Sequence, residues 1–575
     1  MAGQIRMSSI PEIPKNPEFL NVHVKNINQN DCVISFELIN YVENTPVFVT
    51  LNNMTRKEIT ASMKKVDTHY EYNLNELNAD SRYSFYLSVK TTKGEFLSNI
   101  YSFATIKITI YGVRVDESQS NPANAVTYIE DAVGISPGNN TGLGGWTDKF
   151  PFNQIKIVGF NNGQVTKEIK KENKLQYIDG TSFNVNTDED IMVQIPKIYW
   201  DVKTITNGYE IRISDKKFND TCDCFAHKVC GIEKDYNYIG AFGGWIGSSG
   251  KLRSLPNKAL AVNKNIAAYR TAAEAKGKGY CQNNYYQGKL ITLLALISHK
   301  SLNTQASIGK GYTNGRTSLS NTGTTNTKGF VWGEQTGNYQ MCYLGIEDFY
   351  GNALWFVDGI KTDSSLNVKA ISDNYNFSND SKYETLCKLT AQNGFLTKVM
   401  TDNKTLFLPK TVGGSSSTYY TDKCVTAAGN YISVFGGSRS NNLQSGAFSL
   451  LMNIGATSTA ATRGARLCYL GYPLEISAHI LAVGNDEYKP TYIEINLYSD
   501  SEILEFYLIY NDKTINLKPY LKKDIYEYNY FKIRPEEFKN IIHNKSDVAT
   551  IVVKNKYEKI NKNCVIDRGH TEGTN

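Results

Sequence analysis

The stretch from Tyr343 to Ile360 constrains the fold of this chain more than any other, because it joins a tight turn to an uninterrupted apolar segment. Ala353-Leu-Trp-Phe-Val357 has the length of one strand and is apolar on both faces, which favours a strand buried on both sides; a short buried helix is the alternative that periodicity leaves open. Gly351 and Asn352 precede it, and both residue types accept the positive φ that a tight turn needs. The sequence therefore predicts a turn that leads directly into a core strand.

The residues from Gly345 to Trp355 resemble the "G-L-x-D-M-x-G-N-V-W-E-W" signature of the formylglycine-generating-enzyme branch of the C-type lectin fold. They are more similar still to lectin-type domains in tail and receptor-binding proteins of phages that infect low-GC Gram-positive bacteria. Gly112–Asp116 and Asn121–Tyr128 resemble the opening of those phage proteins, and Gly464–Cys468 resembles their closing core strand. The resemblance implies a C-type lectin-like α+β domain over residues 108–473, in which Gly464 and Arg466 are structural.

The composition of the 575 residues fits several globular domains rich in strands, because 41% are hydrophobic and the chain holds 38 tyrosines. A net charge of +6 is too small for this length to indicate nucleic-acid binding. No window is apolar enough for a membrane span, and Met1–Pro11 lacks the apolar core of a signal peptide. We therefore expect a soluble protein made in a cytoplasm, with its ten cysteines as free thiols, and the resemblance implies that this is the cytoplasm of a bacterial host.

Residues 12–107 read as short strands separated by turns, preceded by an arm over residues 1–11. Leu77 and Tyr83 have the spacing of the tyrosine corner in fibronectin type III domains, so this segment resembles that β-sandwich. The expected strands are Val33–Leu38, Val47–Leu51, Tyr83–Val89 and Tyr101–Ala104.

Two helices are predicted in the centre, Ile266–Lys276 and Tyr285–His299, and the second shows the spacing of an amphipathic helix packed on a sheet. Tyr383–Leu389 is a further possible strand. Residues 474–575 read as a small C-terminal β-sandwich, with strands at Tyr492–Tyr498, Leu504–Tyr510 and Val548–Val553 and a helical turn or two at Pro535–Ile542. The predicted fold class is mainly β with an α+β centre.

One cluster resembles a metal site: Cys222, Cys224, His227 and Cys230 fall within nine residues. Thiolate and imidazole groups bind Zn²⁺, but the spacing C-x-C-x2-H-x2-C is not that of two separated C-x2-C pairs. A partly buried loop with free thiols is the default interpretation. Metal binding by these four residues stays open, and we expect no metal and no cofactor.

Catalysis is not expected. Formylglycine-generating enzymes need a redox-active cysteine pair close in sequence, whereas Cys424 and Cys468 are 44 residues apart. Asp348 with Glu347 or Asp358 could form a glycosidase pair, but we expect these acids to cap turns beside the core strand. Residues 425–463 contain no Asp or Glu, which disfavours a calcium-dependent sugar site there.

A ligand face is predicted within residues 413–463, where aromatic and small polar residues mix. Tyrosine offers contact area at small entropic cost, and Ser and Asn supply adaptable hydrogen bonds. The alternative is that these are turn residues with their aromatic rings in the core. Ser438–Asn442 and Ser445 are the residues most expected at the surface. The predicted ligand-binding residues are Tyr419, Tyr420, Tyr431, Ser438, Arg439, Asn441, Asn442, Ser445 and Phe448.

The resemblance implies a virion protein, specifically a tail or baseplate receptor-binding protein that recognises a glycan or protein on the host cell. It further implies a homotrimer that contacts other virion proteins, with no nucleic-acid partner and no membrane insertion. A head fibre or decoration protein on the capsid is the alternative with the same adhesive fold. An oxidase of the formylglycine-generating type is the third and is disfavoured by the cysteine spacing.

Overall fold

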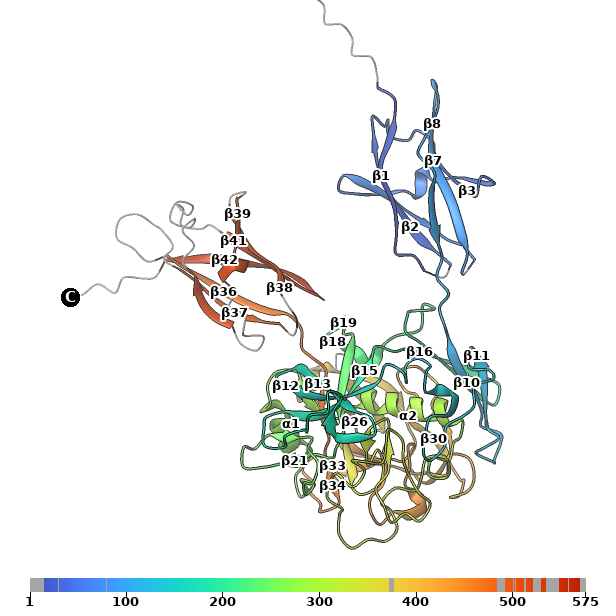
Figure 1. Ribbon diagram of the computed structural model, residues 1–575, viewed down its shortest axis with the longest axis vertical. Coiled ribbons are helices and arrows are strands. Elements are labelled where there is room, and N and C mark those ends of the chain that lie inside the picture. Colours follow the sequence, from blue (N-terminus) through green and yellow to red (C-terminus); the bar gives the residue numbers. More distant parts are fainter. Residues whose placement is uncertain are drawn as a thin grey trace, which may run out of the picture. The chain divides into compact units, whose positions relative to one another are not determined.

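A computed structural model divides the chain into two compact units, residues 1–109 and 110–575 (Figure 1). The residues it describes are 15–28, 30–78, 80–371, 377–482, 492–499, 501, 503–510, 513–520, 529–533, 548–556 and 558–568. Strands greatly outnumber helices among them, which confirms the predicted mainly β fold class. None of the helices in these ranges is long and apolar enough to span a membrane.

Two antiparallel sheets form the first unit. The first has the order β1-β2-β6-β5, with β1 Glu18–Lys25, β2 Cys32–Ile39, β5 Lys64–Val66 and β6 His69–Leu74. The second has the order β4-β3-β7-β8, with β9 also paired to β7; its strands are β3 Val47–Leu51, β4 Thr55–Glu58, β7 Arg82–Thr91, β8 Gly94–Leu97 and β9 Tyr101–Ala104. A 3₁₀ turn, η1, covers Thr60–Ser62. All four strands predicted here are present.

The predicted tyrosine corner is confirmed. The hydroxyl oxygen of Tyr83 accepts a hydrogen bond from the backbone N–H of Asn78 at 2.6 Å, and Leu77 is buried in the core. The ring of Tyr83 stacks on Phe103, with 5.5 Å between centroids. The hydroxyl thus fixes the chain just before β7, where the two sheets are joined.

Two large sheets organise residues 110–473. One has the order β14-β13-β12-β15-β20-β35-β23 and consists of β12 Lys156–Asn161, β13 Gln164–Lys170, β14 Asn173–Tyr177, β15 Asp190–Pro196, β20 Tyr236–Gly240, β23 Tyr280–Gln282 and β35 Leu467–Tyr469. The other runs β28-β27-β26-β32-β33-β31-β29-β30 with β34 beside β26; its strands are β26 Leu354–Thr362, β27 Asn367–Ile371, β28 Tyr383–Lys388, β29 Gln392–Val399, β30 Pro409–Val412, β31 Lys423–Thr426, β32 Tyr431–Phe435, β33 Leu450–Gly455 and β34 Arg463–Gly464.

Smaller elements complete this part of the chain. A four-stranded sheet has the order β11-β10-β17-β16, with β10 Tyr111–Asp116, β11 Val126–Glu130, β16 Tyr199–Ile205 and β17 Gly208–Ser214. Three short hairpins pair β18 Lys228–Val229 with β19 Ile232–Glu233, β21 Trp245–Ile246 with β22 Leu252–Arg253, and β24 Cys342–Tyr343 with β25 Ile346–Glu347. The helical segments are α1 Ile266–Glu274, α2 Tyr285–His299, α3 Thr304–Ser307, η2 Gly144–Trp146, η3 Phe225–His227, η4 Asp380–Lys382 and η5 Asn442–Gln444.

Helix α2 has the predicted bounds but not the predicted amphipathic exposure. All of its residues except Gly288 are buried, because strands and loops surround it (Figure 1). Its polar side chains are satisfied by those loops: Lys289 donates to the carbonyl of Lys404 at 2.6 Å, and Thr292 donates to the carbonyl of Ala447 at 3.0 Å. The spacing of the leucines in α2 predicts only its apolar face. Its polar face is buried by loops that lie more than a hundred residues later in the chain, which the spacing does not show.

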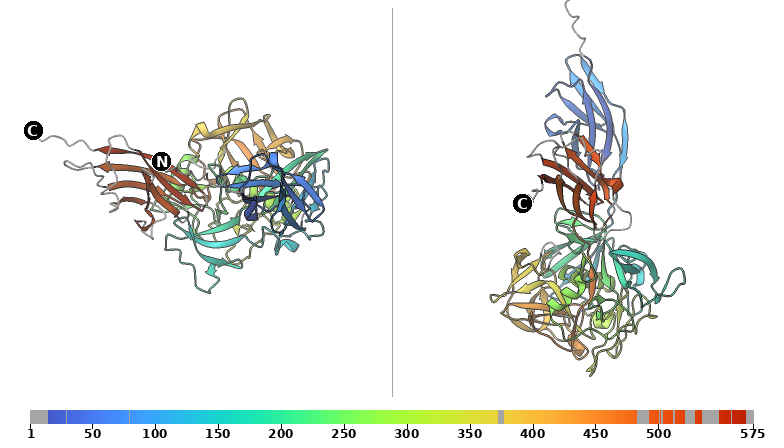
Figure 2. Two further views of the ribbon diagram at one scale, coloured as in Figure 1. Left: turned by 90° about the horizontal axis from the view of Figure 1, so that it is seen from above. Right: turned by 90° about the vertical axis from the view of Figure 1, so that its left-hand side faces the viewer.

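The last strands pair only with one another in the described ranges. Their order is β39-β38-β41-β42-β36-β37-β40, with β36 Glu475–Ala482, β37 Tyr492–Tyr498, β38 Ile503–Tyr510, β39 Lys513–Asn516, β40 Asn529–Ile533, β41 Val548–Asn555 and β42 Lys559–Arg568. A 3₁₀ turn, η6, covers Lys518–Tyr520. The three strands predicted in this region are present, and the helical turn predicted at residues 535–542 lies outside the described residues. Figure 2 gives two further views of the chain.

Replacing Tyr83 by Phe removes the corner hydroxyl and leaves the ring in place. We expect a loss of about 1 kcal/mol in the stability of the first unit, the usual net value of one hydrogen bond. Hydrogen exchange should locate the change at the amide of Asn78. Tyr86→Phe in the same strand is the matched control, since no hydrogen bond of the Tyr86 hydroxyl is present among the described residues. Equal protection of Asn78 in both variants would contradict this role.

Candidate functional site

A buried arginine ties the two large sheets together. The guanidinium of Arg466, between β34 and β35, donates to the carbonyls of Gly240, Glu347 and Asp348 at 2.9, 2.6 and 3.0 Å. It also lies over the ring of Trp355, 4.9 Å from the ring centroid. A buried cation is tolerated only when its hydrogen bonds are satisfied. The guanidinium therefore holds the carbonyls of Glu347 and Asp348, and with them the turn that precedes β26. The structural role expected for Arg466 is confirmed.

The acids of this turn are internal ligands of the protein itself. Glu347 accepts hydrogen bonds from the backbone of Gly323 and Thr325 at 2.7 and 2.9 Å. Asp348 accepts from the side-chain amides of Gln340 and Asn352 at 2.5 and 2.8 Å. Burial, together with the charge of Glu347, raises the pKa of Asp348 well above its usual value. Both side chains are buried, which supports a structural role and leaves no accessible carboxylate pair here.

Asn352 connects this buried network to the surface loops. It has the predicted positive φ, 60°, and its side chain is buried. Its amide oxygen accepts from the N–H of Ser320 at 2.9 Å, and its amide nitrogen donates to the carbonyl of Ser320 at 3.1 Å. Its backbone donates to the carbonyl of Tyr312 at 2.8 Å and accepts from the N–H of Arg439 at 2.9 Å. One turn residue thus holds two distant loops in register.

Three loops meet around this turn, and we call their exposed surface the three-loop face. They are residues 312–320, 334–339 and 438–444. The first two are joined by the amides of Thr313 and Asn314, which both donate to the carbonyl of Gly337 at 3.0 and 2.9 Å. The first and third are joined by the amide of Asn442, which donates to the carbonyl of Thr313 at 2.9 Å. The exposed residues of the face are Asn314, Gly315, Arg316, Thr317, Ser318, Gln335, Thr336, Tyr339, Ser440, Asn442 and Leu443.

The three-loop face combines two large side chains with small polar ones. Tyr339 is 60% exposed and Leu443 is 40% exposed, in a surrounding of Asn, Ser, Thr, Gln and Arg residues. Arg439 is partly buried, and its guanidinium donates to the carbonyl of Thr317 at 3.0 Å. Such a surface offers contact area and adaptable hydrogen bonds on a backbone that is already fixed.

Four of the predicted ligand residues are buried, so the expectation that they face a ligand is wrong. Tyr420 donates its hydroxyl to Glu117 at 2.7 Å and lies beside the hydroxyl of Tyr209 at 2.9 Å. The ring of Phe448 packs edge-on against Tyr420, 5.0 Å between centroids. Ser438 and Ser445, both expected at the surface, are also buried. The interpretation left open for the aromatics, that they belong to the core, holds for Tyr420 and Phe448.

The other five predicted residues differ in exposure. Asn442 is exposed, whereas Tyr419, Tyr431, Arg439 and Asn441 are partly buried. The side chain of Asn441 is used internally, since its oxygen accepts from both the N–H and the hydroxyl of Ser438 at 2.7 Å. The prediction therefore found one of the three loops. Residues 312–320 and 334–339 were missed because no local pattern links them to residues 438–444.

The four residues of the metal-like cluster do not converge. His227 is buried, with its Nε2 3.0 Å from the side-chain nitrogen of Asn237, and burial lowers its pKa to about 3. Cys230 is exposed, whereas Cys222 and Cys224 are buried. The nine cysteines from Cys32 to Cys468 are all free thiols, as predicted.

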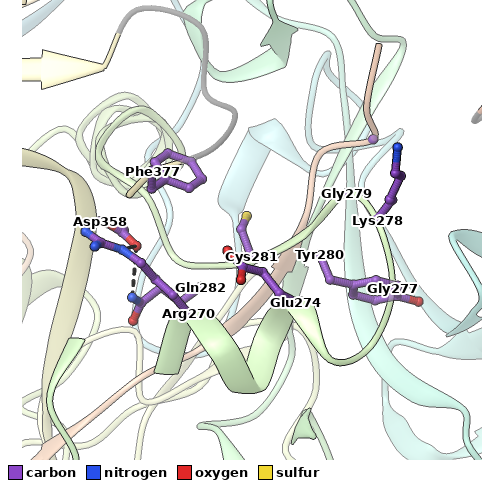
Figure 3. Close-up of a pocket in the computed structure, with 11 residues that line it drawn as sticks. Arg270, Glu274, Gly277, Lys278, Gly279, Tyr280, Cys281, Gln282, Asp358 and Phe377 are labelled. Atoms are coloured by element: carbon purple, nitrogen blue, oxygen red, sulfur yellow. Dashed lines mark hydrogen bonds and ion pairs between the residues drawn. The ribbon is translucent and has the colours of Figure 1, made fainter. Parts of the chain in front are cut away.

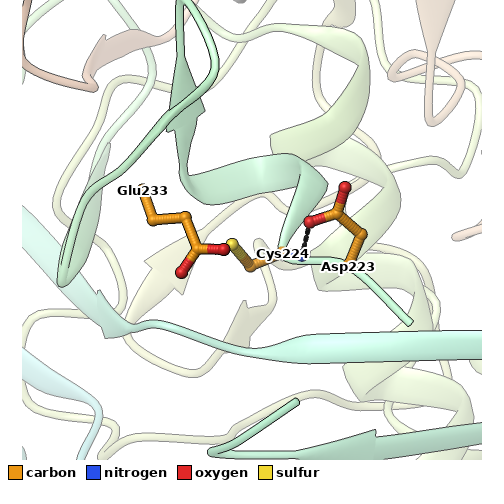
Figure 4. A group of neighbouring side chains, drawn as sticks. All are labelled: Asp223, Cys224 and Glu233. Carbon is orange, nitrogen blue, oxygen red and sulfur yellow. Dashed lines mark hydrogen bonds between the residues drawn. The ribbon is translucent and has the colours of Figure 1, made fainter. Parts of the chain in front are cut away.

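Cys224 belongs to a different group, with Asp223 and Glu233 (Figure 4). The sulfur of Cys224 and one carboxylate oxygen from each acid lie within 4.8 Å of one another. Both carboxylates are already neutralised by lysines. Lys228 is 2.5 Å from Asp223, and Lys197 is 3.1 Å from Glu233. Burial raises the pKa of the Cys224 thiol, which keeps it protonated. Asp223 and Glu233 therefore form ion pairs within this group, beside a protonated thiol.

The cysteines considered for oxidase chemistry are also far from forming a pair. Cys424 lies in β31, where its thiol is 3.3 Å from the carbonyl of Phe448. Cys468 lies in β35 of the other large sheet, opposite Cys281. Burial raises the pKa of both Cys424 and Cys468 to about 12.

Comparison with known proteins identifies the first unit. A fibronectin type III domain family profile matches residues 12–105, so this part of the chain is a fibronectin type III domain, as predicted. No curated protein matches the sequence.

Solved structures show only distant similarity. A structure described as a myokine is 19% identical over 16% of this chain and 100% of its own, with a TM-score of 0.13. A major tropism determinant, variant U1, is 12% identical over 67% of this chain and 81% of its own, with a TM-score of 0.21. A family 64 laminaripentaose-producing β-1,3-glucanase from Paenibacillus barengoltzii, complexed with laminarihexaose, is 10% identical over 34% of this chain and 64% of its own, with a TM-score of 0.12. Scores of this size do not establish a shared fold, and the C-type lectin assignment stays a prediction.

Replacing Asn352 by Gly should destabilise the second unit by about 2–4 kcal/mol, because three side-chain hydrogen bonds are lost, one of them to the buried carboxylate of Asp348. Asn352→Ala should cost about 1–2 kcal/mol more, since alanine disfavours the positive φ that glycine accepts. Denaturant unfolding measures both. Full stability of the glycine variant would show that Asn352 does not hold the loops.

Alkylation with iodoacetamide should modify Cys230 well before the buried Cys222 and Cys224, because burial raises the pKa of these two thiols and limits access. Mass spectrometry of peptides from the native protein measures the order, and the same reaction in denaturant is the control. Simultaneous modification of all three thiols would contradict the described burial.

Proposed function

We propose that this chain is an adhesion protein of a bacteriophage or phage tail-like particle and that the three-loop face contacts a host cell-surface glycan or protein. The observation that carries the proposal is the anchoring of three polar loops on one buried turn, through Asn352 and Arg439. Loops fixed in this way lose little entropy on binding, and their exposed residues can vary without disturbing the core. The sequence resemblance to phage receptor-binding proteins supports the same function.

The fibronectin type III domain has a spacer or docking role in this proposal. It places the second unit at a distance from the particle, where several copies act together. Single-site contacts of low affinity become strong when many copies on one particle bind at once. A homotrimer attached to tail or baseplate proteins follows from the resemblance and belongs to the same proposal.

No catalytic role is part of the proposal. Glu347 and Asp348 are occupied by internal hydrogen bonds, and Asp358 is held by Arg270 at 2.6 Å. Buried acids engaged in this way stabilise the fold.

The combined variant Arg316→Ala, Tyr339→Ala and Asn442→Ala should reduce cell binding at least about tenfold, because it removes an exposed ring and two hydrogen-bonding groups from the face. The measurement is the binding of fluorescently labelled protein to cells of a panel of low-GC Gram-positive strains, with and without EDTA. We expect strain-selective binding that resists EDTA.

Tyr236→Ala is the matched control, because Tyr236 is 44% exposed and lies in β20, outside the three loops. Equal loss of binding in the control would remove the face from the proposal. If the labelled protein binds purified capsids but binds cells of none of the strains, a head-fibre or decoration protein is favoured.

A further inference from the structure

A pocket of about 280 Å³ opens at the C-terminal end of α1 (Figure 3). Its walls come from α1, the turn that follows it, strand β23, strand β26 and two later residues. The lining residues are Arg270, Glu274, Gly277, Lys278, Gly279, Tyr280, Cys281, Gln282, Asp358, Phe377 and Gly471. The volume is close to the lower end of the ~300–1,000 Å³ typical of small-molecule pockets, so it suits one small ligand unit.

The polar wall of the pocket is fixed in advance. Arg270 holds Asp358 through two hydrogen bonds, Nε to Oδ2 at 2.7 Å and Nη2 to Oδ1 at 2.6 Å. Gln282 donates to the same carboxylate at 2.9 Å, and the N–H of Gly359 donates at 2.8 Å. Asp358 is therefore saturated and serves to orient the two side chains beside it.

Each of these two side chains keeps a polar group without a protein partner among the described residues. In Arg270, whose side chain is 20% exposed, the Nη1 nitrogen makes no hydrogen bond to the protein. Gln282 is fully buried, yet its amide oxygen is unsatisfied. A buried polar atom without a partner is costly, and here it belongs to a residue that lines a pocket. The pocket thus offers Nη1 of Arg270 as a donor, and the exposed carboxylate of Glu274 is an acceptor in the same lining.

The charges of the lining residues balance, because Arg270 and Lys278 stand against Asp358 and Glu274. Glu274 is exposed, forms no ion pair with the described residues, and adds a second acid to Asp358. The pocket also adjoins the C-terminal end of α1, where the helix dipole is negative. A charged ligand would therefore lie beside lining groups of its own sign, whereas a neutral ligand meets no such repulsion.

A hydroxyl group satisfies this combination, because it donates and accepts at once. Neighbouring hydroxyls can accept from Arg270 and donate to Glu274, while Phe377 gives apolar surface for the C–H face of a sugar ring. We propose that this pocket binds one neutral monosaccharide unit of a glycan. The site shares no residue with the three-loop face, so it is a second binding site that stands without the adhesion proposal.

Saturation-transfer NMR on the full chain tests the site with glucose, galactose and N-acetylglucosamine as neutral probes, and with glucuronate and glucosamine as charged ones. At least one neutral sugar should bind, and glucuronate should bind at least about tenfold more weakly. Glu274→Gln should weaken the neutral sugar about tenfold or more, the range expected for one hydrogen bond to a charged group. Because Glu274 is exposed, this variant leaves the fold intact.

Glu172→Gln is the matched control, since Glu172 is an exposed acid in the turn between β13 and β14, outside the pocket. It should bind sugar like the parent chain, and so should the Arg316, Tyr339 and Asn442 variant of the three-loop face. The proposal is overturned if no neutral sugar binds, if glucosamine alone binds, if glucuronate binds as well as the neutral sugars, or if Glu274→Gln has no effect. Loss of cell binding with sugar binding retained would separate the two sites.

Discussion

The burial of the Arg466 guanidinium is the constraint on which the second unit depends. Its hydrogen bonds go to backbone carbonyls of two separate segments, at Gly240 and at Glu347 with Asp348. A cation in the core without these partners would be destabilising by several kcal/mol, so neither segment can move alone. The closing strand β35, strand β20 and the turn before β26 are thereby held as one body. The ring of Trp355 covers the same guanidinium and excludes water from it.

Hydrogen bonds between buried residues connect this centre to the surface loops. Asp348 receives the amide of Asn352, and Asn352 in turn fixes loops that are separated by more than a hundred positions in the chain. The exposed side chains of these loops are the ones that do not hold the buried turn in place. A surface of this kind can change its residues while its backbone stays in place, which is the physical requirement for recognising variable receptors.

Sequence patterns within a short segment correctly predicted the features that residues of the same segment determine. The bounds of α2 follow from its caps: Asn284 accepts the N–H of Gln287 at its start, and Lys300 adopts a left-handed conformation at its end. The tyrosine corner and the strand around Trp355 follow from spacing in the same way. Burial of Tyr420 could not be predicted like this, because its partner Glu117 lies 303 positions earlier in the chain. The loops beside residues 438–444 were missed for the same reason, since only long-range hydrogen bonds bring them there.

Strand β26 serves both sites, yet it serves them at different positions. Asn352, just before its start, holds the three-loop face, and Asp358, further along, orients Arg270 and Gln282 in the pocket. A rigid buried strand can support two sites without coupling them, because coupling needs an element with two alternative arrangements. The pairing of β26 with β32 and the burial of its side chains hold both positions on one strand. A substitution on one of the two surfaces therefore leaves the other in place, whereas a substitution that displaces β26 itself would disturb both.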